Sequence, residues 1–206
     1  MAVKKRKISP RKSPKQDRSQ VLVEAILTAA ARILVRSGYD GSTTNKIAEV
    51  AGVSIGSLYQ YFPNKEALIG ALIERQLGRH KELLQAKLRE NEGRPFEELI
   101  DVIIQVVVEL FMDNRALLRS LFELAPRLDR LKTVLATRKA IGALFTQLLK
   151  AQPARVRPKN IPLAVYVALH SVMGVVQTAV LDSSEIYTSL ELKGELSDLV
   201  KNYILR

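Results

Sequence analysis

The sequence predicts an all-α protein of about nine helices, and three observations lead to that prediction. The chain has 206 residues, of which 47% are hydrophobic, with no Trp and only 10 Gly and 8 Pro. Apolar residues recur at intervals of three and four along most of the chain. Gly, Pro and capping residues separate these stretches. The length allows one domain or two small ones, each with a real core.

The charge of the chain is uneven. Lys and Arg exceed Asp and Glu by 11, and residues 1–20 hold eight basic residues against one acid, Asp17. Such a concentration indicates a polyanion partner, nucleic acid first and an anionic membrane surface second. Residues 1–17 are expected to be a disordered basic arm on DNA phosphates or in the minor groove, although a solvated tail has the same composition. The run KKRK also resembles a nuclear import signal.

Two further features concern the compartment. There is no Cys, which excludes disulfides and thiol chemistry and fits a cytoplasmic protein. The basic start is not followed by an apolar run, so no signal peptide is expected.

The first expected helix spans residues 18–36, where the apolar residues form one stripe. Ser37-Gly38 should end it. Residues 43–65 then predict two short helices joined by a tight turn. Ser42 or Thr43 can cap the first, residues 44–50, and Gly52 supplies the turn. Ser54 can cap the second, residues 55–61, and Pro63 prevents its continuation.

This pair has the form of a helix-turn-helix, whose second helix can enter the major groove of DNA. Its outer face is expected to be small, uncharged and hydrogen-bonding, and is formed by Ser54, Ile55, Gly56, Ser57, Tyr59, Gln60 and Tyr61. An ordinary helical hairpin in an all-α core would have the same turn chemistry.

The run TTxxIAxxAGVSxGxLYxYFxxKxxL in residues 43–68 closely resembles the DNA-binding domain of the tetracycline-repressor (TetR) family. The resemblance covers about residues 18–75 in detail and implies a dimeric, ligand-responsive transcriptional regulator, usually a repressor. It places Thr44, Ser57, Tyr59, Tyr61 and Lys65 where phosphates are typically held, beside Thr43 at the start of the motif. It places Asn45, Ser54, Ile55, Gly56 and Gln60 where bases are typically approached.

The rest of the chain predicts six further helices. Asn64 can cap a long one over residues 65–90, the candidate mechanical link between reader and sensor. Residues 91–95 form a loop, and the apolar residues 96–112 predict a buried helix, although their β-branched run also suits a strand. Asp113 can cap a helix over residues 114–124. Pro126 should open the next, to residue 150, with Leu128, Leu131, Leu135, Ile141, Phe145 and Leu148 inward. Residues 152–160 should be an exposed loop.

Residues 163–181 are apolar enough to approach the lower limit for a membrane span. They include His170, Ser171, Gln177 and Thr178, however, and polar groups are costly in lipid. The better interpretation is a helix packed on its own core and on a partner, so no membrane is expected. A last amphipathic helix is expected from the stripe of Leu192, Leu196, Leu199, Val200 and Tyr203. The resemblance implies a homodimer through the last two helices, and Ala164, Ala168, Ser171 and Gly174 would allow close approach.

No catalytic or metal chemistry is expected. His80 and His170 lie on different expected helices, and no nucleophile, phosphate-loop or dinucleotide motif is present. We expect no enzyme, no cofactor and no metal. An effector pocket, for an apolar or amphipathic molecule, is expected among the fourth to eighth helices. Its candidate residues, each also explicable as core or interface, are Phe111, Arg119, Phe122, Phe145, Tyr166, His170, Met173 and Gln177.

The sequence therefore predicts three segments: a basic arm (1–17), a helix-turn-helix DNA-binding domain (18–64) and a helical effector-binding and dimerisation domain (65–206). The expected function is a cytoplasmic repressor that binds a palindromic operator as a dimer and is released by a small molecule. The alternative is a DNA-bound scaffold that recruits a protein partner and senses no small molecule.

Overall fold

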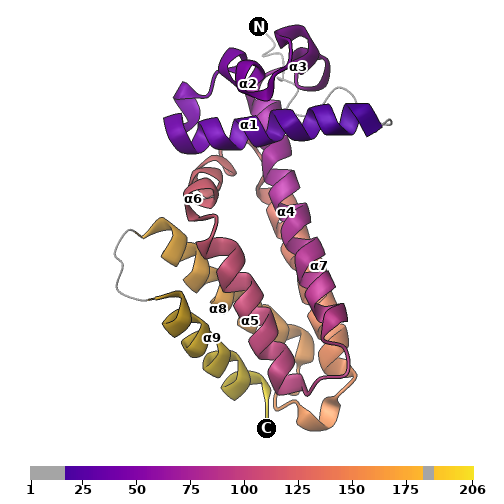
Figure 1. The fold of residues 1–206 in the computed structure, drawn as a ribbon. Helices are drawn as coiled ribbons and strands as arrows, with labels where there is room; N and C mark the ends of the chain where they lie inside the picture. The colour runs from indigo at the N-terminus through magenta and orange to yellow at the C-terminus, as the bar shows by residue number, and fades with distance from the viewer. Residues whose placement is uncertain (1–16, 183–187) are drawn as a thin grey trace, which may run out of the picture. The chain divides into compact units, whose positions relative to one another are not determined.

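The computed structural model describes residues 17–182 and 188–206, and over these residues the protein is all-α (Figure 1). The expected arm lies outside the described residues except for Asp17. The helices are α1 Asp17–Gly41, α2 Thr44–Ala51, α3 Ile55–Tyr61, α4 Lys65–Glu90, α5 Phe96–Met112, α6 Arg115–Leu124, α7 Leu131–Lys150, α8 Ile161–Leu181 and α9 Ser189–Ile204. The expected nine helices and the helical state of residues 96–112 are thereby confirmed.

The chain folds into two compact units. Of the described residues, the first unit holds those up to Gln76 together with Arg119–Lys132, and the second holds those within Leu77–Leu118 and Thr133–Arg206. The helix α4 therefore begins in the first unit and ends in the second. The first unit is larger than the expected domain of residues 18–64, because it takes the start of α4 and a distant segment of the chain.

In the first unit, α1 packs on α2, and α2 packs on α3. Gly38 kinks α1 with φ 67° and ψ −176°, where the sequence predicts the helix to end. The hydroxyl of Ser42 donates to the carbonyl of Gly38 at 2.7 Å and closes this corner. Ile26, Ile47 and Leu58 are fully shielded from solvent, so one apolar core joins the three helices.

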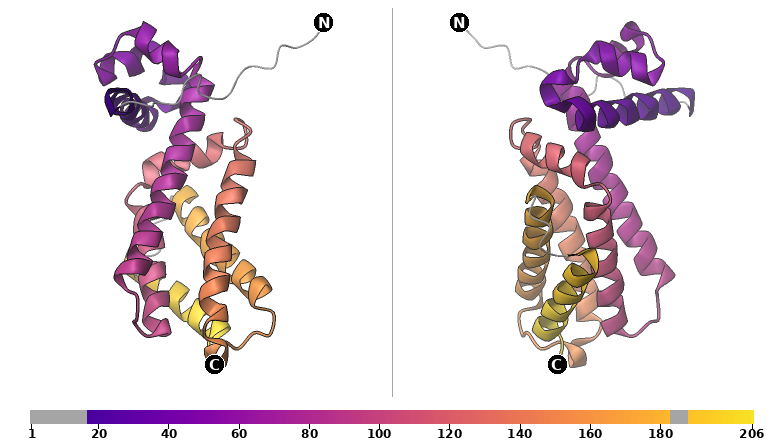
Figure 2. Two further views of the ribbon diagram at one scale, coloured as in Figure 1. Left: turned by 90° about the vertical axis from the view of Figure 1, so that its right-hand side faces the viewer. Right: turned by 60° about the vertical axis from the view of Figure 1, so that its left-hand side comes forward.

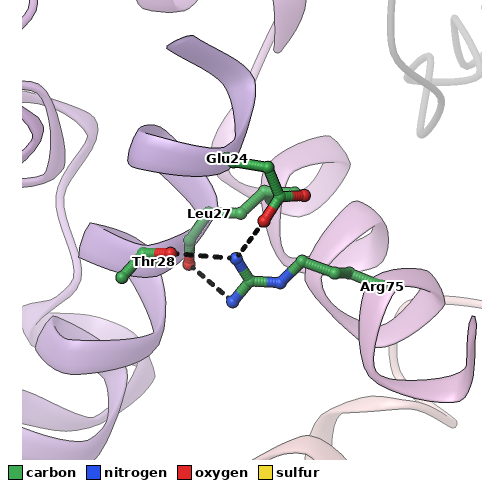
Figure 3. A network of polar contacts seen from close by, with 4 residues as sticks. All are labelled: Glu24, Leu27, Thr28 and Arg75. Atoms are coloured by element: carbon green, nitrogen blue, oxygen red, sulfur yellow. Dashed lines mark hydrogen bonds and ion pairs between the residues drawn. The ribbon is translucent and has the colours of Figure 1, made fainter. Parts of the chain in front are cut away.

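Arg75 fastens α4 to α1 (Figure 3). Its guanidinium donates to Glu24 at 3.2 Å, to the hydroxyl of Thr28 at 3.1 Å and to the carbonyl of Leu27 at 3.3 Å. The side chain of Arg75 is only 9% exposed, so these contacts replace most of the water that the charge would otherwise have. They hold the first part of α4 against α1, the helix on which α2 packs.

Arg130 makes a second attachment to α4 within the same unit. Its Nη1 lies 2.8 Å from Oε1 of Glu74. Its guanidinium covers Gly70, where a Cβ would lie only 2.5 Å from Nη2 of Arg130. The turn after α6 thus packs on α4 through Arg130, whose guanidinium occupies the space that a side chain at residue 70 would take.

In the second unit, α5 packs closely on α9, and α8 contacts both; the three helices lie together in Figures 1 and 2. Lys193 on α9 lies 2.8 Å from Glu109 on α5, and Lys201 lies 2.5 Å from Asp101. Burial acts to raise the pKa of Asp101, but hydrogen bonds from Lys201 and Ser197 and the charge of Lys201 outweigh it and lower the pKa. The hydrogen bond from Lys193 is the main cause that lowers the pKa of Glu109.

The expectations for the turn after α6 were wrong in part. Residues 126–129 form turns, with Asp129 at φ 53°, so α7 begins at Leu131 instead of Pro126. Leu131 and Leu135, expected to face inward, are 52% and 49% exposed, whereas Leu128 is buried. Asp113 follows the end of α5 as its C-cap, and α6 begins at Arg115.

The expected loop of residues 152–160 is not exposed throughout. It contains a short 3-10 helix, Pro153–Arg155, and Val156 is buried and pairs with Leu205 in an isolated β-bridge. Asn160 caps α8 through a hydrogen bond from the backbone N–H of Leu163 at 3.2 Å. By length and composition α8 alone, among the helices described, could cross a membrane, a test that core helices of soluble proteins also pass.

Candidate nucleic-acid interface

The start and end of α2 follow from local chemistry. Thr43 is the N-cap, and its hydroxyl accepts from the backbone N–H of Lys46 at 3.3 Å. Gly52 ends the helix at φ 67° and ψ 30°, a left-handed conformation that favours glycine. The N–H of Val53 then donates to the carbonyl of Ala48 at 3.0 Å. This turn sets the direction in which α3 leaves α2.

Ser54 positions the start of α3. Its hydroxyl accepts from the backbone N–H of Ser57 at 3.0 Å and shares a hydrogen bond with the hydroxyl of Ser57 at 2.8 Å. Leu58 is completely buried against α2, while Ile55, Tyr59 and Gln60 are exposed. The helix therefore presents an uncharged outer face and holds its inner face in the core.

Tyr59 is fixed to the start of α2 by its hydroxyl, which lies 3.0 Å from the hydroxyl of Thr44. The ring of Tyr59 remains exposed, and Asn45 is exposed beside it on α2. The contact between Thr44 and Tyr59 thus joins the exposed sides of α2 and α3. Lys46 is a further candidate for DNA contact, because it is exposed on α2 and carries a positive charge. It follows the expected cap Thr43 by three residues, so the sequence alone could have indicated it.

Gly56 is exposed in the first turn of α3, and nothing inside the chain requires a glycine there. A Cβ on Gly56 would meet only the hydroxyl oxygen of Ser54, at 3.8 Å, which is ordinary contact. Glycine weakens a helix relative to alanine. The missing side chain leaves the backbone of α3 open to a close approach from outside.

Lys65 and Tyr61 are held by the chain itself. The Nζ of Lys65 donates to the carbonyl of Tyr39 at 2.8 Å and lies 3.8 Å from the centre of the Tyr39 ring. Tyr61 is buried, with 9% of its surface exposed, so its expected place on the outer face of α3 was wrong. Leu58 and Tyr61 are three residues apart and lie on the same, inner face of the helix.

The comparisons with known proteins agree with the helix-turn-helix geometry of α2 and α3. Residues 26–72 match the model of bacterial regulatory proteins of the tetR family, and residues 95–204 match that of the tetracyclin repressor-like C-terminal domain. The chain belongs to the TetR family. The members of this family are transcriptional regulators, which are not enzymes.

Curated relatives and solved structures extend this assignment. The chain is 36% identical over 90 residues to the HTH-type transcriptional regulator TtgR of Pseudomonas putida, covering 44% of this chain and 43% of TtgR. It is 31% identical over 143 residues to the HTH-type transcriptional repressor BepR of Brucella suis, covering 64% of this chain and 66% of BepR. The match to TtgR thus spans less than half of that protein's length.

Two solved structures share the fold over nearly the whole chain. The fatty acid degradation regulator FadR of Bacillus halodurans has a TM-score of 0.68 at 23% identity, covering 92% of this chain and 96% of FadR. NalD of Pseudomonas aeruginosa, the secondary repressor of the MexAB-OprM multidrug efflux pump, has a TM-score of 0.71 at 19% identity, covering 91% and 98%.

The expected effector residues of this TetR-family chain are divided between the two units. Arg119 and Phe122 belong to the first unit, and Arg119 is exposed in a 3.7 Å ion pair with Glu123. Tyr166 is exposed and stacks on His170, with ring centres 4.0 Å apart. Of the remainder, Phe111 is buried, and the half-buried ones are Phe145, Met173 and Gln177. No group of acidic and imidazole side chains suited to a metal occurs among the described residues.

Proposed function

We propose that this protein is a repressor that binds a palindromic operator as a homodimer and leaves it when a small-molecule effector binds. The surface of α2 and α3 is the observation that carries the proposal. The outer face of α3 is uncharged and able to form hydrogen bonds, and Tyr59 is fixed by Thr44. Gly56, at the start of α3, has no steric reason inside the chain to be glycine. A helix with such a face suits the major groove, where base edges present donors and acceptors.

The roles proposed for single residues separate into two classes. The phosphate-binding class is Thr44, Ser57, Tyr59 and Lys65, with Thr43 beside it, and the base-reading class is Asn45, Ser54, Ile55, Gly56 and Gln60. Tyr61 belongs to the first class only through its hydroxyl, because most of its side chain is buried. Phosphate contacts position a protein on DNA, and base contacts specify the sequence.

Selection from random DNA gives the operator, and variants then test the two classes. Tyr59→Phe removes only the hydroxyl and should weaken binding to all sequences alike. Replacement of Gln60 or Asn45 by Ala should change which sequence is preferred. An unchanged site preference after both replacements would remove these two residues from the base-reading class.

An exposed apolar face on α8 supports the homodimer. Leu163 and Tyr166 are 55% and 59% exposed, and Val167 and Val175 are exposed with them. A Cβ at Gly174 would meet no atom within 4 Å, which leaves room for a second helix to approach. A symmetric dimer covers such a face with the same face of a second copy.

The dimer test uses two matched substitutions. Leu163→Glu and Leu131→Glu place a charge on an equally exposed leucine near the start of a helix. Sedimentation equilibrium should show monomers for the first and wild-type behaviour for the second. Dimers that persist with Leu163→Glu would move the interface away from this part of α8.

The proposed release follows from linkage. An effector lowers operator affinity only if it binds better to a conformation in which the two readers do not fit grooves about 34–36 Å apart. A coupling of about 1–3 kcal/mol changes the affinity about 5- to 150-fold, and operator must weaken effector binding by the same factor. Because α4 begins in the first unit and ends in the second, it is the proposed link. Titration of effector with and without saturating operator measures this factor, and equal affinities would refute release.

A second candidate function is a DNA-bound scaffold with a protein partner. The chain is 32% identical over 113 residues to the nucleoid occlusion factor SlmA of Glaesserella parasuis, covering 54% of this chain and 52% of that factor. The exposed face of α8 would then meet a different protein. A screen in which no metabolite releases operator DNA, while Leu163→Glu abolishes capture of a defined protein partner, would favour this candidate.

A further inference from the structure

His80 on α4 is half-buried in the second unit, and one of its two ring nitrogens is shielded without a hydrogen bond. Its Nε2 is shielded from solvent and has no partner among the described residues. The ring lies against Phe111 of α5, with ring centres 5.4 Å apart and planes tilted by 43°. The other histidine differs, because Nδ1 of His170 lies 2.8 Å from the carbonyl oxygen of Tyr166.

The imidazole of His80 is uncharged at neutral pH. Burial lowers its pKa from 6.5 to about 4, since the positive form would lose its water without gaining a counter-charge. A neutral imidazole carries one donor and one acceptor nitrogen. Leaving a buried polar atom unpaired costs about 1–3 kcal/mol, and native proteins contain few such atoms.

No described residue offsets that cost with a hydrogen bond to Nε2. Leu84, one turn later on α4, is buried, and so is Phe111. Nε2 is therefore an unsatisfied hydrogen-bonding atom beside apolar side chains. It favours an apolar molecule that brings one hydroxyl, and it disfavours an ionised group, which would lose its hydration beside an uncharged ring.

We propose that His80 is the polar contact of the effector site and that the effector is an uncharged aromatic or aliphatic molecule with one hydroxyl, of the phenol class. This inference rests on the proposed function and names the ligand class for it. In this conformation Nε2 is covered, so the hydroxyl reaches it only when α4 and α5 rearrange around Phe111. A ligand that satisfies Nε2 in the rearranged state and not in this one shifts the population toward it.

The place of His80 in the chain connects that rearrangement to DNA binding. Arg75, which fastens α4 to α1, precedes His80 by five residues on the same helix. A shift of α4 at His80 therefore acts on the helix that carries this attachment. His80 is a ligand contact, and Arg75 is a positioning residue for the reader.

The experiment uses three probes of similar size: phenol, toluene and benzoate. The full chain is labelled with ¹⁵N-histidine, and because the chain has two histidines, only two rings contribute to the spectrum. Phenol should shift the Nε2 resonance of His80 and leave His170 unchanged. Toluene, which has no hydroxyl, should shift it much less than phenol at equal occupancy, and benzoate should leave both unchanged. Equal shifts with all three probes, or none with phenol, would overturn the inference.

Variants make the same test by affinity. His80→Phe removes the hydrogen bond and should weaken phenol binding up to about tenfold, the equivalent of about 1.4 kcal/mol, without weakening toluene. His80→Gln keeps a hydrogen-bonding group and should retain part of the affinity. His170→Phe is the matched control and should bind phenol as the wild type does. Unchanged phenol affinity in His80→Phe would overturn the inference.

Operator binding without any probe separates this inference from the proposed function. Wild-type protein that binds operator but not phenol refutes the phenol class alone. Protein that binds no operator refutes the proposed function. Phenol that shifts His80 but leaves operator affinity unchanged refutes His80 as an effector contact.

Discussion

Two glycines on α4 should respond differently to the same substitution. At Gly78 a Cβ would meet no atom within 4 Å, so Gly78→Ala gains helix propensity without steric cost. The gain is about 1 kcal/mol, or about 2–4 °C in the unfolding midpoint for a chain of this length. At Gly70 a Cβ would lie 2.5 Å from Nη2 and 2.6 Å from Nε of Arg130. Gly70→Ala therefore displaces the guanidinium of Arg130 from its position over residue 70.

The cost at Gly70 follows from what Arg130 loses. Its pair with Glu74 is 2.8 Å long, and the two side chains are 14% and 43% exposed, so water screens the pair only in part. Together with lost packing on α4, we expect Gly70→Ala to be about 1–2 kcal/mol less stable than Gly78→Ala.

Denaturant and thermal unfolding of both single variants and of each in an Arg130→Met background measure these effects. Without the guanidinium, Gly70→Ala should become as stabilising as Gly78→Ala, because the obstacle to the new methyl group is gone. If Gly70→Ala and Gly78→Ala differ in stability even in the Arg130→Met background, the packing of Arg130 on Gly70 is not the cause. Equal stability of the two single variants would refute the reasoning as well.

Three further outcomes are expected. The pKa values of Asp101 and Glu109 are lowered in the folded state, so the stability that these carboxylates contribute is present at neutral pH and is lost as the pH falls through their folded pKa values. In Asp101→Asn the unfolding midpoint should therefore decrease less steeply at acid pH than in the wild type. Thr188 and Glu191 form a capping box at the start of α9, so Thr188→Ala should cost about 1 kcal/mol in denaturant unfolding while Thr188→Ser costs little. Arg75→Met should speed hydrogen exchange in α1, and exchange as slow as in wild type would show that α1 does not depend on this attachment.

The sequence was most informative where the determining contacts are local. The caps Thr43 and Ser54 and the left-handed Gly52 act within three or four residues, and all three lie as expected. The start of α7 was wrong because Pro126 is compatible with a first helical turn, whereas Asp129 takes a left-handed conformation that nothing in its neighbours announces. Tyr61 was recoverable, since it follows the buried Leu58 by three residues.

The remaining differences come from contacts between distant residues. Lys65 and Tyr39 are 26 residues apart in the sequence, and Arg130 and Gly70 are 60 residues apart, so neither contact leaves a local sequence pattern. The exposure of Leu131 and Leu135 depends on which face of α7 finds a partner, and periodicity does not settle that. The burial of His80 is equally a product of tertiary packing.

The division of the chain bears on how regulators of this kind are recombined by design. A chimera joined once, after Gln76, keeps Gly70 and Glu74 but replaces Arg119–Lys132, which completes the first unit. A foreign segment without an arginine in place of Arg130 leaves Glu74 without its partner. An exchange of intact units needs three crossovers, after Gln76, Leu118 and Lys132. The reading half of this protein is thus transferable only as two pieces of sequence that travel together.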